Sequence, residues 1–152
     1  MARWADFEAA EPGLAGRVSA IFGGRKHHTL ATLRRDGSPR VSGTEVEFRD
    51  GEMILGMMPG SLKLADARRD PRIALQGLSD DPPADDQAAW QGDAKVAGRL
   101  VELPPRPEDQ PPGPRLRIDI DEVVLTALAD PPVELLIESW HPDRGLEVRR
   151  RA

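Results

Sequence analysis

Apolar positions recur at helical spacing at the start of the chain and alternate with polar positions over most of the remainder. Between Trp4 and Phe22 the apolar residues lie mainly at three-, four- and seven-residue intervals, and Pro12 stands where a second helix can begin. From His28 onward the pattern becomes strand-like. The sequence therefore predicts two short helices, or one broken helix, followed by a series of strands.

Seven segments are predicted as strands because polar and apolar residues alternate in them, or because short apolar runs are bounded by turns. They are residues 28–33, 41–48, 53–58, 72–78, 94–103, 115–128 and 133–140. Asp-Gly turns join the first three, which we expect to form an antiparallel meander. The connections at 79–93 and 104–114 are acidic or proline-rich, and we expect exposed loops there.

This many antiparallel strands in one small domain must protect their edges, and closing the sheet into a barrel does so. We therefore expect a mainly β protein with a few short helices. The 152 residues suffice for one domain, with a helical segment over 1–24 and a barrel over 26–151.

Composition narrows the possible functions. Hydrophobic residues make up 39% and charged residues 31% of the chain, and the formal charge of −5 offers no general attraction for nucleic acid. The chain has no cysteine, which excludes disulfides, thiolate metal sites and cysteine nucleophiles. No apolar run approaches the roughly 20 residues of a membrane span, and no signal-peptide core is seen. We expect a cytoplasmic protein without a membrane or nucleic-acid partner.

The segment MMPGSLKLADARRDP, residues 57–71, allows two interpretations of one turn. Ser61 stands where a helix is expected to begin, and a serine there caps the first free amides. Lys63 lies in the first turn, where a cation opposes the helix dipole. A bound phosphate would reverse the sign of that interaction, since free amides, a hydroxyl and an ammonium together suit an anion. Alone, the motif favours capping with an incidental lysine.

Arg40 adds a second cation to this hypothesis. It begins the strand after the first Asp-Gly turn, and in a meander that strand lies next to the one leading to Ser61. The simpler interpretation is an exposed turn cation beside Arg34 and Arg35. If the meander forms as expected, Arg40, Ser61 and Lys63 converge on one anion.

The other polar residues offer little chemistry. His27 and His28 are adjacent and face opposite sides of a strand, so we expect no metal centre. Asp119 and Asp121 share a strand face, but the regular alternation around them indicates a solvated face. No nucleophile triad or glycine-rich nucleotide loop is present.

Four segments resemble, in order and spacing, the flavin-binding split β-barrels related to pyridoxamine 5'-phosphate oxidase. They are SPRVSGTEVEF, DGEMILGMMPGSLKLADARRDPRIAL, GDAKVAGRLVEL and IESWHPDRGLEVRR. The likeness covers roughly residues 26–151, and its most specific element is the Ser-x-Lys turn with Asp-Pro-Arg after a short helix. It implies a six-stranded antiparallel split β-barrel of Greek-key-like order, in a homodimer with cofactors at the interface.

The resemblance also implies a set of cofactor contacts. In such proteins a strand-initial Arg and its two neighbours lie along the flavin, the Ser-x-Lys pair holds the flavin phosphate, and late residues approach the flavin of the other subunit. The matching positions are Arg40, Val41, Ser42, Met57, Met58, Ser61, Lys63, Trp140 and Arg150.

Departures from the family pattern bear on the activity. Leu62 stands where the oxidase has an Arg that binds phosphate, and Asp93 stands where it has a Gln near the flavin ring. Leu146 and Val148 replace the Arg and His that hold the oxidase's substrate. A site that leaves the substrate's polar groups unpaired loses several kcal/mol of discrimination, so the vitamin B6 reaction is not expected.

We therefore expect an FMN-dependent oxidoreductase acting on another small molecule, in which the cofactor carries the chemistry and no catalytic side chain is identified. Two alternatives stay open. One is a deazaflavin coenzyme in place of FMN. The other is a non-catalytic protein on the same barrel that binds haem, with His28 or His141 as ligand, or another small molecule.

Overall fold

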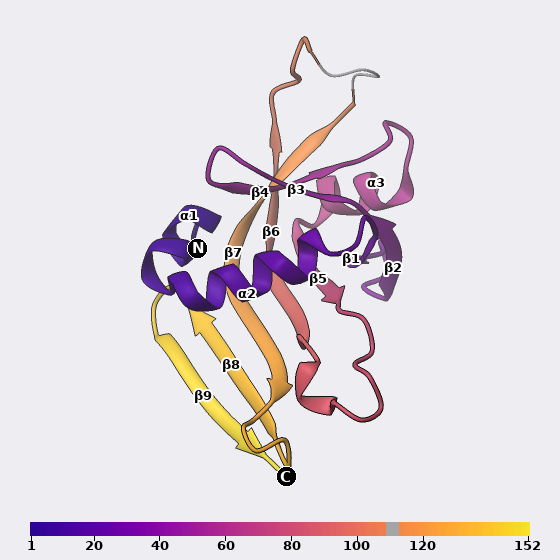
Figure 1. Ribbon diagram of the computed structural model, residues 1–152. Helices are drawn as coiled ribbons and strands as arrows, with labels where there is room; N and C mark the ends of the chain where they lie inside the picture. Colours follow the sequence, from indigo (N-terminus) through magenta and orange to yellow (C-terminus); the bar gives the residue numbers. More distant parts are fainter. Residues whose placement is uncertain (109–112) are drawn as a thin grey trace.

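The computed structural model describes residues 1–108 and 113–152, and Figure 1 shows the arrangement of its helices and strands. The α-helices are α1 (Trp4–Ala10), α2 (Pro12–Gly23) and α3 (Leu62–Arg69), and a short 3₁₀ helix spans Gln87–Ala89. The strands are β1 (His28–Leu33), β2 (Pro39–Thr44), β3 (Val46–Arg49), β4 (Glu52–Gly56), β5 (Arg72–Leu78), β6 (Asp93–Leu103), β7 (Arg115–Leu128), β8 (Leu135–His141) and β9 (Gly145–Arg151).

The two predicted N-terminal helices are present and meet at Glu11, with Pro12 in the first turn of α2. Proline is favoured there because its missing N–H has no partner within the helix. Helix α2 lies across the strands in Figure 1 and buries its apolar side, with Val18, Ile21 and Phe22 almost inaccessible to solvent. Helix α2 therefore packs its apolar side against the sheet.

All strand pairs in the described residues are antiparallel, as predicted. The order along the sheet is β2-β1-β5-β6-β7-β4-β3, and β8 and β9 extend from β7 as a hairpin. The two ends of this path, β2 and β3, follow each other directly in the chain through Glu45. The result is a mainly β split barrel in which the chain itself joins the two ends of the sheet.

The strand prediction fails at residues 41–48. The structure has two strands where the sequence predicted one. Strand β2 pairs with β1 whereas β3 pairs with β4, and the chain changes partner at Glu45. The predicted meander is therefore wrong, since β4 pairs with β3 and β7 and does not lie beside β2. Local alternation indicates where strands form but not which strands become neighbours.

The described part of the chain has nine strands, two more than the seven segments predicted from the pattern and three more than the six that the resemblance implies. The division at Glu45 adds one, and β9 adds another that periodicity did not reveal, since three of its seven residues are consecutive arginines. Strand β9 is held by its register with β8, from His141–Gly145 to Leu135–Arg151. Backbone pairing rather than burial of an apolar face explains this strand.

The core is largely aliphatic, with a cluster of aromatic rings under α1. Trp4 and Phe7 lie edge to face at 5.2 Å, and Phe7 contacts Trp140 of β8 at 5.0 Å. The long β6–β7 pair bends at a bulge between Ala97 and Gly98, where a side chain at 98 would collide with the β7 backbone. These contacts fix the sheet that carries the candidate site.

Of the two predicted loops, 79–93 is mostly exposed and contains the 3₁₀ helix, while 104–114 lies partly outside the described residues. Within the described ranges, no helix combines the length and apolar character needed to cross a membrane.

Candidate functional site

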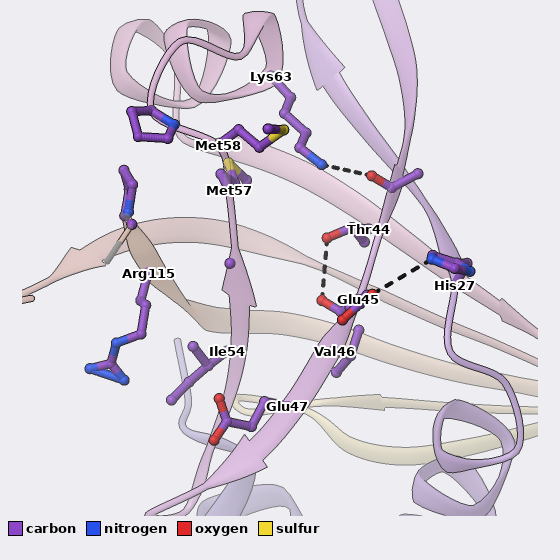
Figure 2. A pocket seen from close by; sticks show the side chains of 15 residues that line it. His27, Thr44, Glu45, Val46, Glu47, Ile54, Met57, Met58, Lys63 and Arg115 are labelled. Carbon is purple, nitrogen blue, oxygen red and sulfur yellow. Dashed lines mark hydrogen bonds and ion pairs between the residues drawn. The ribbon is translucent and has the colours of Figure 1, made fainter. Parts of the chain in front are cut away.

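A pocket of about 780 Å³ opens where β2 continues into β3, beside β4 and the turn that precedes α3 (Figure 2). We call it the seam pocket. It is lined by His27, residues 43–47, Ile54, residues 56–59, Lys63 and residues 113–115. Its volume is within the range of small-molecule sites, which is about 300–1,000 Å³.

One wall of the seam pocket is apolar. Val46 of β3, Ile54 of β4 and Met57 line it, and Met57 is 5% exposed. Met58 and Pro59 continue this wall toward α3, and the Met58 side chain is 78% exposed. A long thioether side chain at the mouth of a pocket adapts readily to a bound surface.

Lys63 supplies a positive charge at one end of the pocket. Its ammonium donates a hydrogen bond to the Gly43 carbonyl at 2.7 Å, and it forms no ion pair with any carboxylate of the described residues. A neutral carbonyl does not cancel the charge, so Lys63 can still bind an anion. The first turn of α3 places Lys63 at this position.

Two carboxylates also line the seam pocket, but each has basic neighbours. Glu45 lies 3.6 Å from both Lys26 and His27. Glu47 lies 3.6 Å from Arg49, with Arg106 nearby. Arg115 also lines the pocket (Figure 2). These basic neighbours offset the charge of the two acids, and the Lys63 end therefore suits an anion.

Ser61 caps α3, as the sequence predicted. Its Oγ accepts a hydrogen bond from the Leu64 amide at 3.3 Å. Its own amide donates to the Met58 carbonyl at 3.0 Å, which closes the turn. Ser61 does not line the seam pocket, so the structure itself supports the capping role.

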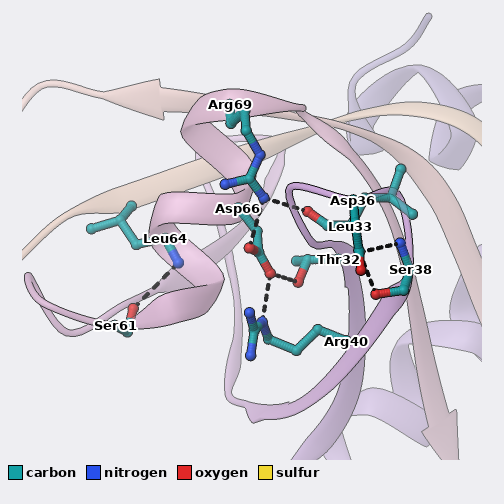
Figure 3. A network of polar contacts seen from close by, with 9 residues as sticks. All are labelled: Thr32, Leu33, Asp36, Ser38, Arg40, Ser61, Leu64, Asp66 and Arg69. Carbon is teal, nitrogen blue, oxygen red and sulfur yellow. Dashed lines mark hydrogen bonds and ion pairs between the residues drawn. The ribbon is translucent and has the colours of Figure 1, made fainter.

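Arg40 faces a buried carboxylate that the sequence did not single out (Figure 3). Asp66 of α3 is 2% exposed, and its Oδ2 accepts bonds from Arg40 Nε at 2.7 Å and Thr32 Oγ1 at 2.8 Å. Its Oδ1 accepts from Arg69 at 2.9 Å. Burial alone would raise the pKa of Asp66, but hydrogen bonds from Arg40, Thr32 and Arg69 together lower that pKa to about 2. Asp66 is therefore ionised and joins α3 to β1 and β2.

A second pocket, of about 530 Å³, lies against this network. We call it the arginine pocket, and its charged lining residues are Arg34, Arg35, Asp36, Arg40, Asp66 and Arg69. It shares no lining residue with the seam pocket.

The structure does not bring Arg40, Ser61 and Lys63 to one point. Arg40 bonds Asp66, Ser61 caps its own helix, and Lys63 bonds the backbone of β2. The reason is the strand order described above, since β2 and β4 are not neighbours, together with Asp66 of α3, which holds the Arg40 guanidinium. Their roles as cofactor contacts stay predictions, but a single three-residue cradle is not observed.

The other predicted contacts lie apart. Val41 is 71% exposed on β2, and Ser42 beside it is half-buried. Trp140 is 5% exposed because it packs in the core against Phe7, and its contact with a partner's flavin stays a prediction. Arg150 is exposed on β9 and bonds Glu134 at 3.0 Å.

Both histidines considered as haem ligands are engaged within the protein. His28 is buried, and its Nε2 lies 2.9 Å from the Phe22 carbonyl. Burial lowers the pKa of His28, so its ring is neutral at pH 7. His141 Nε2 lies 2.8 Å from a Glu122 oxygen. These contacts give the haem alternative no support.

Sequence reasoning missed the residues that organise the site most directly, which are Thr32, Gly43, Asp66 and Arg69. Asp66 lies in a helix whose sequence, LKLADARR, reads as largely solvated. Asp66 is buried because α3 packs on β1 and because Thr32, Arg40 and Arg69 surround its carboxylate. The sequence around Asp66 therefore gave little indication that its carboxylate is buried.

No protein-family model matches the chain, and no curated protein matches its sequence. Solved structures do match its fold. A pyridoxamine 5'-phosphate oxidase-related, FMN-binding protein from Nostoc punctiforme PCC 73102 superposes with a TM-score of 0.66 at 13% identity, covering 93% of this chain and 95% of that one.

The chain has the fold of the pyridoxamine 5'-phosphate oxidase-related proteins. PhzG from Burkholderia lata 383, solved with tetrahydrophenazine-1-carboxylic acid, matches with a TM-score of 0.65 at 12% identity over 95% of this chain and 90% of its own. General Stress Protein 26 from Bacillus anthracis matches with a TM-score of 0.58 at 17% identity over 74% and 92% of the two chains. At such identities the pyridoxamine 5'-phosphate oxidase-like fold is shared, while the site must be argued from this chain's own residues.

Proposed function

We propose that this protein binds FMN in the seam pocket and acts as a flavin-dependent oxidoreductase on a small molecule other than the vitamin B6 substrate. The observation that carries the proposal is Lys63, whose ammonium pairs with no carboxylate of residues 1–108 and 113–152 and stands at one end of a largely apolar pocket. The match in fold to an FMN-binding protein supports it.

The residues of the seam pocket fit a flavin phosphate and ring. Lys63 would hold the phosphate. Val46, Ile54 and Met57 would form the wall against the ring, and Met58 would close over it. Bound flavin supplies hydride or electron transfer, and the side chains supply binding, orientation and exclusion of water.

Leu62 is consistent with a weaker phosphate site. It is 64% exposed beside Lys63 and offers no hydrogen bond where the resembling oxidase has an arginine. One charge-assisted hydrogen bond contributes about 1.5–3 kcal/mol. We therefore expect FMN affinity in the micromolar range.

We further propose that two copies of the chain pair over the open side of the seam pocket. Large apolar side chains are exposed on the three segments that flank the pocket, namely Val41, Met58 and Leu62 at 71%, 78% and 64%. The outer edge of β2 also pairs with no strand of the described residues. Exposed apolar surface and a free strand edge are features that an interface covers.

Titration of the purified protein with FMN, followed by quenching of flavin fluorescence, tests the cofactor assignment. We expect micromolar binding to the wild type and a loss of about tenfold or more in Lys63→Ala, because one charged contact is removed. Lys95→Ala is the matched control, since Lys95 is exposed on β6 and lies outside both pockets.

Equal FMN affinity in Lys63→Ala and Lys95→Ala would show that Lys63 does not contact the FMN. A parallel titration with the deazaflavin coenzyme compares the affinity of the protein for the two cofactors. If the protein binds neither compound, the proposal is overturned. Reduction of the FMN-loaded protein by NADH or NADPH, followed by transfer to an added acceptor, tests the enzymatic part. A protein that binds FMN but passes no electrons is a carrier and not an oxidoreductase.

A further inference from the structure

His28 of β1 holds the C-terminal end of α2 against the sheet. Its ring nitrogen Nε2 lies 2.9 Å from the carbonyl of Phe22, in the last turn of α2. A carbonyl in the last turn has no partner within its helix and needs one from outside it. Because a carbonyl oxygen can only accept, Nε2 carries the hydrogen and Nδ1 is the bare nitrogen of a neutral ring. The neutral form of His28 therefore joins α2 to β1.

Phe22 makes this end of α2 a meeting point of several strands. Its side chain is 2% exposed, and its ring lies edge to face with the His28 ring at 5.0 Å and with Phe48 of β3 at 6.4 Å. It also packs directly on β5, where a side-chain carbon added to Gly77 would come within 2.8 Å of the ring. A displacement of the α2 end therefore disturbs β1, β3 and β5 together.

The surroundings of His28 disfavour a positive charge on its ring. The side chain is 6% exposed, and Nδ1 is buried without a hydrogen bond to the described residues. Charging the ring would add an N–H at Nδ1, and a buried donor without an acceptor costs free energy. Backbone groups of Phe22 and Arg25 favour the charged form, but burial outweighs them, and the pKa of His28 lies below its ordinary value of 6.5.

Among the described residues, no acid forms an ion pair with His28. The titratable groups that act on its ring are Arg25 and His27, and a positive charge on either opposes a second one on His28. Glu45 lies 3.6 Å from Lys26 and His27 instead. The residues of α2, β3 and β5 that pack here are uncharged. The ring is therefore protonated more readily once it has left this position than while it is held there.

His28 also lies next to the seam pocket. It is the cross-strand partner of Thr44 on β2, which is 3% exposed. Thr44 lines the seam pocket together with His27 and Glu45, the residues that follow these two partners around the pocket wall (Figure 2). A movement of β1 at His28 therefore reaches the pocket wall directly.

We propose that His28 is a pH-sensitive switch, whose neutral ring fastens the end of α2 to β1 and whose protonation releases that end and loosens the wall of the seam pocket at Thr44 and Glu45. The stabilising contact is complete above about pH 6.5 and weakens as the pH falls below it, because the opened form takes up the proton first. The effect on a ligand rests on the proposed FMN site, whereas the switch itself does not.

Nuclear magnetic resonance of the wild-type protein without ligand tests the switch in two ways. The His28 imidazole should carry its hydrogen on Nε2 at pH 7.5 and should titrate below 6.5. Amide hydrogen exchange in the last turn of α2, corrected for the intrinsic chemical rate, should report an opening equilibrium that rises by up to about tenfold per pH unit below pH 6.5. This is the limit when one proton is taken up per opening.

His28→Gln removes the titration, while its amide N–H can still donate to the Phe22 carbonyl. This variant should lose the acid-dependent exchange of the α2 end. His141→Gln is the matched control, since His141 lies on β8 outside the seam pocket, and it should keep the wild-type behaviour.

FMN titration at pH 7.5 and 5.5 tests the effect on the seam pocket. The affinity of the wild type should fall by up to about tenfold per pH unit more than that of His28→Gln. The phosphate of free FMN titrates equally in both measurements, so the difference between the two proteins reports His28 alone.

The switch is overturned if the His28 ring titrates at or above 6.5 in the folded protein. That measurement uses the wild type, so it decides the matter even if His28→Gln does not fold. Equal acid acceleration of exchange in the wild type and His28→Gln also overturns the switch. An equal pH dependence of FMN affinity in these two proteins overturns the effect on the seam pocket. If FMN binds at neither pH, the proposed function fails together with that effect, while the ring titration and the exchange still decide the switch.

Discussion

The two pockets beside α3 differ in the partners of their positively charged side chains. In the seam pocket one ammonium, Lys63, rests on a neutral carbonyl of β2 and lies beside apolar side chains. In the arginine pocket several guanidinium groups surround Asp66, a buried and ionised carboxylate. In the seam pocket the Lys63 charge stays available to a ligand and contributes little to stability. In the arginine pocket the ion pairs of Asp66 with Arg40 and Arg69 help to hold α3 against β1 and β2. The comparison predicts that substitutions will affect stability at one pocket and ligand binding at the other.

The largest effect on stability is expected from Asp66→Asn. The substitution removes the negative charge between Arg40 and Arg69, and breaking one partner of a buried ion pair costs about 3–5 kcal/mol. We expect a decrease of about 3 kcal/mol in the free energy of unfolding, measured by urea denaturation. Asp121→Asn, on an exposed position of β7, should change it by less than about 0.5 kcal/mol. A similar small change in both variants would contradict a structural role for Asp66.

Lowering the pH should reproduce part of this loss of unfolding free energy in the wild-type protein. The folded pKa of Asp66 is about 2, below its ordinary value of 3.8, so the unfolded chain takes up the proton first as the pH falls. The stabilisation is complete above about pH 4 and is lost as the pH falls through about 2. Unfolding free energy measured between pH 5 and 2 should therefore decline more steeply in the wild type than in Asp66→Asn. Parallel curves would contradict the low pKa.

Ser61→Ala tests the turn that stands between the two pockets. Loss of a serine cap costs about 1 kcal/mol, so the free energy of unfolding should fall by about that amount without any ligand present. Ser61→Asp, which retains a cap acceptor, should recover most of the stability. No loss in Ser61→Ala would show that the hydroxyl serves the ligand and not the helix.

Lys63→Ala should have the smallest effect on stability, within about 0.5 kcal/mol, since only one bond to the Gly43 carbonyl is lost. The same variant carries the largest expected change in FMN affinity. Thermal unfolding with and without FMN measures both effects, because a ligand that binds the folded state raises the transition temperature. A large loss of stability in Lys63→Ala without FMN would show that the two pockets do not differ as described.

The features that depend on neighbouring residues were predictable from the sequence. Ser61 was recognisable as a cap because capping depends on the residues directly around it. The break at Pro12 and the extent of β1, β5 and β7 follow in the same way from propensity and alternation. The mainly β class and the antiparallel pairing follow from the number and spacing of these strands.

The features that depend on distant residues were not predictable. The convergence of Arg40 with Lys63 required β2 to lie beside β4, and the change of partner at Glu45 separates them. Asp66 resembled a solvated helix residue, because its burial depends on Thr32 and Arg40, which lie 34 and 26 positions earlier. Trp140 packs against Phe7 in the core, a contact across 133 positions that the sequence does not reveal; its approach to a partner's flavin stays a prediction.

The junction at Glu45 has a consequence for how a ligand enters the molecule. On the sides that face away from β1 and β4, neither β2 nor β3 has a strand partner among the described residues. In a single copy of the chain, a planar ligand can therefore reach these main-chain amides and carbonyls without separating any pair of strands, whereas the proposed pairing of two copies would cover this path. Entry of this kind requires no local unfolding, and the rate of association should be set by diffusion and charge instead of by a slow opening of the barrel.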